Sequence, residues 1–510
     1  MMEKPLSGSS RYLGVIALAL CAFMQVLDTS IANVSIPYIA GDLATSTDDG
    51  AWVITMFAVG NAISLPLTGW LTKRLGSIRL TVLSTSFFTL TSWLCGVSWS
   101  MTMLVILRFI QGFVAGPLIP MSQSLMLVSF PAKQKNLALA LWNMVVIVGP
   151  VIGPILGGWI TYDYSWPWIF FINIPVGIFC TLVIWKIYSS YETPRIKAKV
   201  DAIGIFLLAV GIAAIQILLD RGQDFDWWRS RAIWTLTIVA IVALVAFVLW
   251  EWTEKEPIFD FHFFANRNFS LGVLLTSLSF MLLFSVIVIS PLWLQSGMGY
   301  TALWAGLAVS TLGIFPFCSV LFVAKLMGRF PLRYLVMFGF ICYSLSLFYF
   351  TRFTTAVSVG EVAFSRLLFG VGLSCYLAPL TAISFAHFPK DKLAAGQGIF
   401  HFCRIFMGGV GASLVVTMWE RRSIHHHQYL ANAINPYRPV SNELFATLKE
   451  WHLKGKAALT AVDELVWQQS YLLSVNDVFW VGAWMFIALI IPAFFFKKRR
   501  KIEAEIVSQG

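Results

Sequence analysis

Charged residues are scarce in this chain. Only 12% of its 510 residues are Asp, Glu, Lys or Arg, while 58% are hydrophobic. Soluble globular domains carry about 25% charged residues. The shortage excludes an ordinary soluble domain and predicts an integral membrane protein, because each span needs roughly 20 mostly apolar residues to cross about 30 Å of hydrocarbon.

Closely spaced cysteine pairs are also missing. The seven cysteines are scattered along the chain, and no two of them form a CxxC pair. All of them fall in predicted spans, so we expect neither a disulfide framework nor a metal site. We interpret them as small apolar packing residues.

The sequence lacks the motifs of nucleotide binding and catalysis. No polar segment contains G-x-x-x-x-G-K-[ST], and no clustered His/Glu or nucleophile set appears. We therefore expect no enzyme, no cofactor and no energy from ATP bound to this chain. The net charge of +11 is spread over many short segments, which argues against nucleic acid as a partner. The terminal cluster Lys497–Lys501 is expected to contact anionic membrane lipids.

Long apolar runs dominate what is present. They predict an all-α integral membrane protein with fourteen transmembrane helices. The first run is too long for a cleavable signal peptide, so we expect it to be the first span. The predicted spans are 12–37, 51–70, 79–97, 102–125, 137–160, 168–188, 202–220, 233–251, 269–292, 302–325, 333–352, 358–383, 393–418 and 477–496.

The distribution of Lys and Arg predicts the orientation of these spans. Of the 36 such residues, 23 fall in the segments that are cytoplasmic if the N-terminus is inside, and 4 fall in the short outer loops. Short cytoplasmic loops are enriched in positive charge. We therefore expect a multi-pass protein of the bacterial inner membrane with both termini in the cytoplasm.

A weak internal repeat predicts two halves. Arg108 begins RFIQGFVAG in the fourth span and Arg366 begins RLLFGVGLS in the twelfth, and both spans run inward. We expect an N-terminal six-helix bundle at 1–188 and a C-terminal six-helix bundle at 269–510. Between them, 189–268 is a connecting segment with two inserted helices. The C-terminal part includes a long periplasmic loop at 419–476.

Asp28 is the most unusual residue of the first span. A charge at the membrane centre costs ~2.5–3.5 kcal/mol on insertion scales, so it usually faces a cavity or a partner. At 1.5 Å per residue, Asp28 lies roughly 13 Å from the outer end of its span, and Arg108 lies roughly 9 Å from the outer end of the fourth. The two side chains can therefore meet in the outer half of the bundle.

Two interpretations of this pair follow. A carboxyl group holds its proton more tightly when it is buried and less tightly beside a guanidinium. We favour Asp28 as a proton carrier whose protonation changes with its surroundings. The alternative is a static ion pair that only fixes packing. For Arg108, a role as a relay and a role as a structural clamp are equally open interpretations.

Other polar residues in the spans are candidates for a substrate cavity. Gln111 follows Arg108 by three residues and shares its helix face. For His401 and Arg404, hydrogen bonds to neighbouring helices are the favoured interpretation, and a cavity role is the alternative. The candidate cavity residues are Gln25, Asn33, Gln111, Asn143 and Arg404.

The segment at 149–158, GPVIGPILGG, repeats glycine and proline. Glycines spaced by four form a groove that admits a neighbouring backbone closely. Each proline removes a backbone donor and bends the helix. The motif consists of Gly149, Pro150, Gly153, Pro154, Gly157 and Gly158.

These motifs resemble those of the major facilitator superfamily. GWLTKRLGSIRL at 69–80 resembles its loop motif, although Lys73 stands where an acidic residue is usual. LVILRFIQGFVA at 104–115 resembles the motif with a buried arginine, and GPVIGPILGG resembles the antiporter motif. The loop-motif residues are Gly69, Arg74, Gly76 and Arg79.

Two further segments resemble one subfamily, the fourteen-span drug:proton antiporters. These are LDTSIANVSIP at 27–37 and SWPWIFFINIPVG at 165–177. The resemblance implies a major facilitator fold and a proton-coupled multidrug exporter that works by alternating access. It places the proton-linked carboxylate on Asp28 and the buried arginine on Arg108.

The resemblance also implies partners. Pumps of this kind export hydrophobic or amphipathic drugs in exchange for protons. They serve a tripartite efflux system with a periplasmic adaptor of the EmrA type and a TolC-like outer-membrane channel. In the long loop, His425–His427 could bind a metal, but three adjacent rings cannot converge on one ion from regular structure. Contact of this loop with an adaptor is the favoured interpretation.

Other functions are less well supported by the sequence. An exporter of one metabolite or a siderophore would have the same fold. An uptake symporter is disfavoured by the antiporter-type motif at 149–158. A non-transporting receptor or scaffold would be expected to carry a signalling domain, and no predicted inner segment is long enough for one.

Overall fold

The computed structural model describes residues 8–131, 134–195, 201–222, 225–255, 257–386, 388, 392–435, 437–450 and 452–496. This part of the chain is helical and contains no strand, in agreement with the all-α prediction. Each predicted span overlaps one long helix or two shorter helices that follow each other in the chain.

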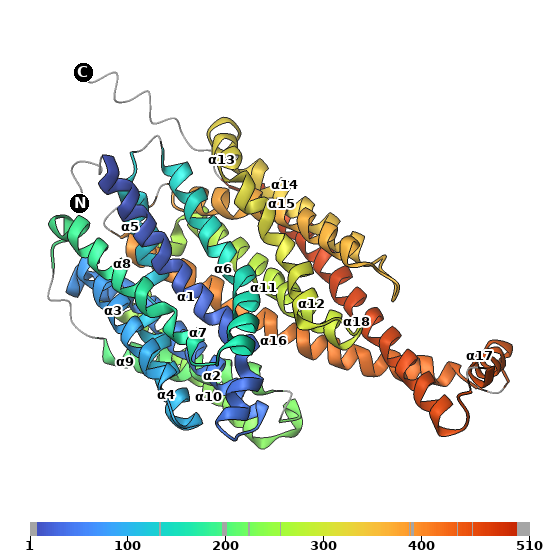
Figure 1. Cartoon of the computed structure of the whole chain (residues 1–510). Helices are drawn as coiled ribbons and strands as arrows, with labels where there is room; N and C mark the ends of the chain where they lie inside the picture. The colour runs from blue at the N-terminus through green and yellow to red at the C-terminus, as the bar shows by residue number, and fades with distance from the viewer. Residues whose placement is uncertain are drawn as a thin grey trace.

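The helices follow one another in the order shown by the colours of Figure 1. They are α1 (Gly8–Asp42), α2 (Thr47–Leu75), α3 (Ser77–Gly96), α4 (Met101–Ala115), α5 (Leu118–Ser129), α6 (Lys135–Asp163), α7 (Trp168–Phe171), α8 (Asn173–Tyr188), α9 (Ala202–Arg221), α10 (Arg231–Thr253), α11 (Arg267–Ser296), α12 (Ala302–Ser310), α13 (Ile314–Arg329), α14 (Leu332–Phe350), α15 (Val359–Ser384), α16 (Leu393–Ala433), α17 (Pro439–Glu450) and α18 (Lys456–Ala493).

Most of these helices are long and apolar enough to cross a membrane. Within the described residues 11 helices meet that standard, or up to 13 if each of two bent pairs forms one span. One bend, of 43°, lies in α6 between Pro150 and Ile155, where prolines remove backbone donors. α3 is not among them because serines and threonines lower its hydropathy. Several of their hydroxyls donate to the carbonyl one turn earlier, as Thr85 does to Thr81.

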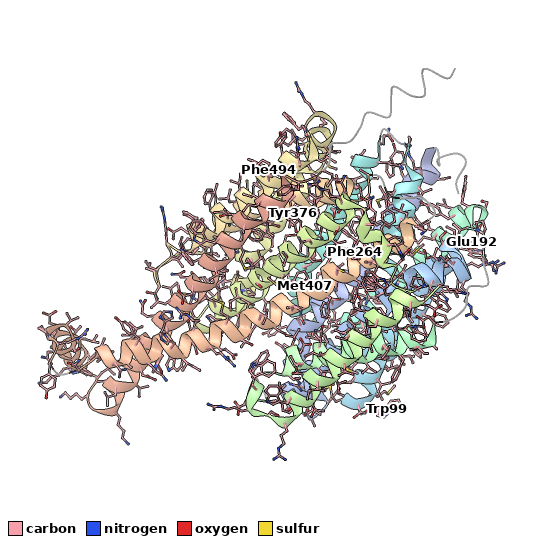
Figure 2. The ribbon with its side chains drawn as sticks, turned by 180° about the vertical axis from the view of Figure 1, so that it is seen from behind. Trp99, Glu192, Phe264, Tyr376, Met407 and Phe494 are labelled. Carbon is pink, nitrogen blue, oxygen red and sulfur yellow. The ribbon has the colours of Figure 1, made fainter. Side chains whose placement is uncertain are left out.

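The helices pack in two groups. The N-terminal helix group, α1–α8, holds together through pairs such as α1 with α6 and α2 with α4. The C-terminal helix group, α11–α18, holds together through α11 with α16 and α14 with α15. α9 and α10 pair with each other, and α9 also contacts α2 and α16. Figure 2 shows this side, where α16, marked by Met407, crosses the molecule.

The two groups meet mainly where α2 faces α16 and where α6 faces α13. The approach is close near the C-terminal end of α2. A Cβ atom on Gly69 would lie 2.5 Å from the Cβ atom of Ala395. Between α5 and α16, His401 Nε2 lies 2.8 Å from Gln123 Oε1. We call this set of contacts the closed seam.

The segment 419–476 differs from the predicted polar loop because most of it is helical. α16 has 41 residues and is about 60 Å long, twice the thickness of the hydrocarbon. Its last turns pair with the first turns of α18, and α17 lies at the tip (Figure 1). We call 419–476 the protruding hairpin.

Cross-helix contacts explain why these polar residues form helices. Arg422 Nη2 lies 2.6 Å from Asp477 Oδ2, and His426 Nε2 lies 2.8 Å from the same oxygen. His427 instead contacts Asp463 and stacks on Trp467, with ring centroids 4.1 Å apart. The adjacent histidines thus face different partners. The sequence pattern missed this pairing because the partners lie 36–55 residues apart.

The predicted glycine groove lies against α1. A Cβ atom on Gly153 would lie 2.5 Å from Ser30 Cβ, and one on Gly157 would lie 2.9 Å from the carbonyl oxygen of Ile31. Gly149 faces Val26 in the same way. Gly158 lies off this line, and an added Cβ would meet nothing within 4 Å. The side chain of Pro154 lies outside the described part of the chain.

The difference between these glycines gives a test with a built-in control. Gly153→Leu forces a side chain into the α1–α6 contact, and overpacking of this kind costs about 1–3 kcal/mol. We expect a lower melting temperature in detergent, measured by intrinsic fluorescence. Gly158→Leu makes the same change in open space and should melt near the wild-type temperature. Equal melting temperatures for the two variants would contradict the groove.

Candidate functional site

Asp28 of α1 and Arg108 of α4 form a buried ion pair. Arg108 Nη1 donates to Asp28 Oδ2 at 2.5 Å. Both residues are 0% exposed. The depth comparison from sequence places the two charges in the same half of the membrane, and the fold brings them into direct contact.

Three more polar side chains complete the cluster around Asp28. Its Oδ1 accepts from Gln111 Nε2 at 3.3 Å and from Asn173 Nδ2 at 3.1 Å. Asn173 also donates to Ser92 Oγ at 3.0 Å. The carboxylate therefore receives donors from α4 and α8, and its charge is offset inside the protein rather than by water.

Arg108 is held by a carbonyl and by aromatic rings. Its Nε donates to Val53 O at 3.1 Å, and its Nη1 also donates to Gln111 Oε1 at 2.8 Å. The guanidinium lies 4.3 Å from the ring centroid of Phe57 and 5.4 Å from that of Phe170. Rings exclude water and attract the cation through their faces.

Close packing of α2 on α4 brings the carbonyl of Val53 to Arg108. A Cβ atom on Gly112 would collide with the carbonyl oxygen of Phe57, and one on Gly60 would collide with that of Phe109. Two glycines thus let the two backbones touch. The ion pair depends on this approach, because any larger residue would move the ring of Phe57 and the carbonyl of Val53 away.

The structure does not bring the candidate cavity residues into one pocket. Gln111 belongs to the ion-pair cluster. Gln25 is buried on the same side of α1, one turn before Asp28, and its Oε1 has no partner among the described residues. Asn33 is exposed. It follows Asp28 by five residues, which turns it about 140° away from that face.

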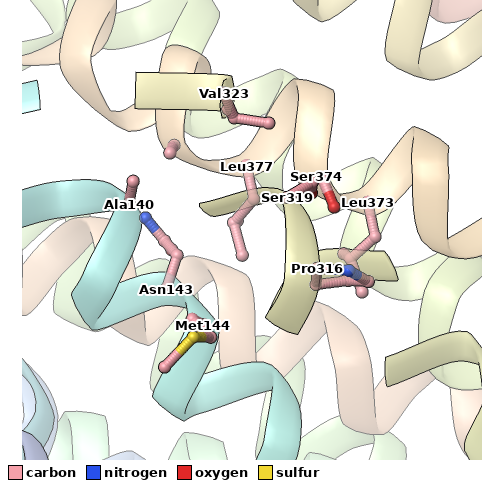
Figure 3. Close-up of a pocket in the computed structure, with 10 residues that line it drawn as sticks. Ala140, Asn143, Met144, Pro316, Ser319, Val323, Leu373, Ser374 and Leu377 are labelled. Atoms are coloured by element: carbon pink, nitrogen blue, oxygen red, sulfur yellow. The ribbon is translucent and has the colours of Figure 1, made fainter. Parts of the chain in front are cut away.

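Asn143 lines a small cavity between the two helix groups (Figure 3). The volume of this cavity is about 20 Å³, roughly the room of one water molecule. A drug does not fit there in this arrangement of the helices. The lining residues are Ala140, Asn143, Met144, Pro316, Ser319, Val323, Leu373, Ser374, Leu377 and Ala378.

Arg366 corresponds to Arg108 in position only. It is 0% exposed, and its guanidinium lies 4.6 Å from the ring centroid of Phe350 and 5.3 Å from that of Phe479. None of its three nitrogens has a hydrogen-bond partner among the described residues. The repeat therefore preserves the arginine, but the described part of the second half supplies no carboxylate to it.

The predicted loop motif forms the junction of α2 and α3. Gly76 has φ of +89°, a conformation that side-chain-bearing residues rarely adopt. Glu192 lies directly beside it and accepts from the backbone amides of Ile78 and Arg79, each at 2.9 Å. Arg79 Nε lies 4.0 Å from Glu192 Oε2.

The other two loop-motif residues have separate roles. The guanidinium of Arg74 lies 5.3 Å from the ring centroid of Trp70, and Gly69 packs in the closed seam. Lys73, the residue that departs from the family pattern, is exposed. The carboxylate at this junction is Glu192, which lies more than 100 residues away in sequence.

Sequence reasoning missed several residues that the fold brings to these sites. Asn173 lies inside the segment at 165–177 that resembles the subfamily, so a signal existed there, but the residue received no role. Ser92, Gln123 and Glu192 carried no signal. Each acts through a partner from a distant helix, and such pairs cannot be read from one sequence.

The chain is similar to known proteins in both sequence and fold. The sequence profile described as Major Facilitator Superfamily matches residues 18–412. The "Multidrug export protein EmrB" of Haemophilus influenzae is 42% identical over 97% of each chain. That of Escherichia coli K12 is also 42% identical over 97% of each chain. The "Fatty acid resistance protein FarB" of Neisseria gonorrhoeae is 43% identical over 95% of this chain and 96% of its own length.

A solved structure supports the same fold. The proton:xylose symporter XylE superimposes with a TM-score of 0.58, covering 96% of this chain and 97% of the symporter. Sequence identity is 12%, so this likeness concerns the fold alone. Together with the buried charge pair and the two helix groups, these matches show that the chain is a multi-pass membrane transporter that belongs to the Major Facilitator Superfamily.

Proposed function

We propose that this chain is a proton-coupled multidrug exporter of the bacterial inner membrane that works by alternating access. The observation that carries the proposal is the buried cluster around Asp28 and Arg108, a carboxylate that a proton can neutralise within a membrane-spanning helix group. The relatives named as multidrug export proteins, with 42% identity over 97% of each chain, support drugs as the cargo.

In this proposal the two six-helix bundles, 1–188 and 269–510, rock against each other. The closed seam seals one side of the central space, and rocking must separate α2 and α5 from α16 there. The helices inserted at 189–268 stay beside the seam, since α9 contacts both α2 and α16. The small cavity beside Asn143 then widens to admit a drug.

Protonation of Asp28 couples the proton to this motion. A proton on the carboxylate removes the negative charge that Arg108 needs. Removing one partner from a buried ion pair costs about 3–5 kcal/mol, because the other charge is left uncompensated. Arg108 then favours an arrangement of α1 and α4 in which another acceptor or water reaches it. Loss of the proton restores the pair and the present arrangement.

A static ion pair is the competing interpretation, and Asp28→Asn distinguishes the two. This variant keeps the shape of the side chain but cannot carry a proton. We expect at least about a tenfold loss of drug efflux driven by a pH gradient in proteoliposomes, because the coupling charge is gone. Drug exchange without a gradient should persist, and size-exclusion chromatography should show a folded protein.

Asp226→Asn is the matched control, because it makes the same change at an exposed carboxylate between α9 and α10. We expect wild-type efflux from it. Undiminished gradient-driven efflux by the Asp28→Asn variant would refute the proton-carrier role.

The proposed orientation places both termini in the cytoplasm and the protruding hairpin in the periplasm. The excess of Lys and Arg in the predicted inner segments supports it. Tyr437 in the hairpin is 95% exposed, so Tyr437→Cys should react with a membrane-impermeant maleimide in intact spheroplasts. Lys73→Cys, at the α2–α3 junction, should react only after permeabilisation. The opposite pattern would reverse the orientation.

We further propose that the protruding hairpin binds a periplasmic adaptor of the EmrA type, which leads to a TolC-like outer-membrane channel. Exposed apolar side chains on the hairpin support this role. Tyr429 is 71% exposed and Val440 is 74% exposed. Exposed apolar side chains on a segment outside the membrane favour a protein partner.

Charged residues introduced on the protruding hairpin should therefore weaken adaptor binding without affecting transport. We expect Tyr429→Glu combined with Val440→Glu to reduce co-purification of the adaptor by about tenfold, while efflux in proteoliposomes stays at the wild-type rate. Gln468→Glu adds a charge at an exposed polar position and should leave co-purification unchanged. Full adaptor binding by the double variant would show that the adaptor docks elsewhere.

A further inference from the structure

One face of α16 carries buried polar groups that have no hydrogen-bond partner among the described residues. Gln397, His401 and Arg404 follow one another at spacings of four and three, so they share a helix face. They are 0%, 0% and 1% exposed. Both polar atoms of the Gln397 amide, His401 Nδ1, and Nε and Nη1 of Arg404 have no hydrogen-bond partner among the described residues.

Arg404 is the charged member of this face. Within the described part of the chain, no Asp or Glu lies within ion-pair distance of it. The ring centroid of Phe280, in α11, lies 4.5 Å from the guanidinium. Arg108, in contrast, has Asp28. A buried cation with unfilled donors is costly unless an anion completes the site.

The position of Arg404 places this cation at the boundary between the two helix groups. His401, one turn earlier, contacts Gln123 of α5 across the closed seam. Ile405, the next residue, packs against the apolar cluster of the N-terminal helix group. Arg366 also lacks a hydrogen-bond partner among the described residues, but it is enclosed by rings inside the C-terminal helix group. Separation of α5 from α16 therefore opens space beside Arg404 and not beside Arg366.

We propose that Arg404 binds the anionic group of the transported molecule, and that the chain selects amphipathic acids. This inference rests on the proposed export function. A guanidinium offers donors in a planar fork that matches a carboxylate or phenolate. The apolar body of the ligand would lie along the tilted ring pair Phe280 and Phe284, whose centroids are 5.8 Å apart. The substrate, rather than the protein, supplies the missing carboxylate.

A matched pair of ligands tests this assignment directly. The probes are a fluorescent dodecanoic acid and its methyl ester, which share the apolar body and differ in charge. Binding is measured by fluorescence anisotropy to the full chain in nanodiscs of zwitterionic lipid, so that no anionic head group competes. We expect the wild-type protein to bind the acid about tenfold more tightly than the ester, as charge-assisted hydrogen bonds predict.

Variants at Arg404 should remove this preference. Arg404→Gln should weaken binding of the acid about tenfold and leave binding of the ester unchanged, while Arg404→Lys should retain part of the preference. Arg352→Gln makes the same neutralisation at an exposed arginine and should bind both probes as the wild type does. Equal affinities of the wild-type protein for acid and ester would overturn the proposal, and this comparison needs no variant.

Equal weakening of acid and ester by Arg404→Gln would also overturn the assignment, because it would indicate a packing role. Transport separates this inference from the function on which it rests. If the Arg404→Gln variant loses export of the acid but still exports a neutral drug under a pH gradient, both proposals stand. If it exports the acid as the wild type does, the anion site is wrong and the exporter remains. If the wild-type protein exports nothing under a gradient, the proposed function fails whatever the binding data show.

Discussion

The contact between Asp28 and Arg108 imposes the strictest requirement on this structure. Two opposite charges inside a membrane protein are tolerated only when the pair is closely matched and the remaining donors and acceptors are filled. Here Gln111, Asn173 and the carbonyl of Val53 meet most of that need, and among the described residues only Nη2 of Arg108 has no hydrogen-bond partner within the pair. Four helices, α1, α2, α4 and α8, must therefore hold fixed positions around one salt bridge.

Glycine contacts on both sides of the pair keep those positions. Gly60 and Gly112 let α2 touch α4, and Gly153 and Gly157 let α6 touch α1. In lipid, the hydrophobic effect does not drive helices together, so close van der Waals contact between backbones carries much of the association. The same contacts that stabilise the N-terminal helix group therefore set the geometry of its charge pair.

The two helix groups use their buried arginines differently. Arg108 has a carboxylate, Arg366 has phenylalanine rings, and Arg404 has one ring and unfilled donors at the seam. In the proposed mechanism the N-terminal group handles the proton and the C-terminal group handles the anionic end of the cargo. This division separates the two charges that an exporter of acids must manage, because a substrate carboxylate beside Asp28 would be repelled while Asp28 is ionised.

Features that depend on local sequence could be predicted, whereas contacts between residues far apart in the chain could not. Apolar runs and the requirement for roughly 20 residues per span predicted the all-helical membrane fold. Helical rise placed Asp28 and Arg108 at matching depths. The polar composition of 419–476 suggested a loop, whereas pairing between Arg422 and Asp477 over 55 residues makes it a helical hairpin. Polarity alone also does not specify which helix face turns inward, and the structure exposes Asn33.

By itself, the sequence determined the helical membrane fold, the two buried charges and the glycine line, because each depends on local composition, helical period or depth along one span. Only the tertiary structure decided which buried polar groups have a hydrogen-bond or ion-pair partner. It brought Asn173 to Asp28, Glu192 to the α2–α3 junction and Gln123 to His401, and among the described residues it placed no carboxylate beside Arg404. The physical reason is that a hydrogen bond or ion pair depends on separations of about 3 Å, and helices far apart in the chain reach such separations only through packing.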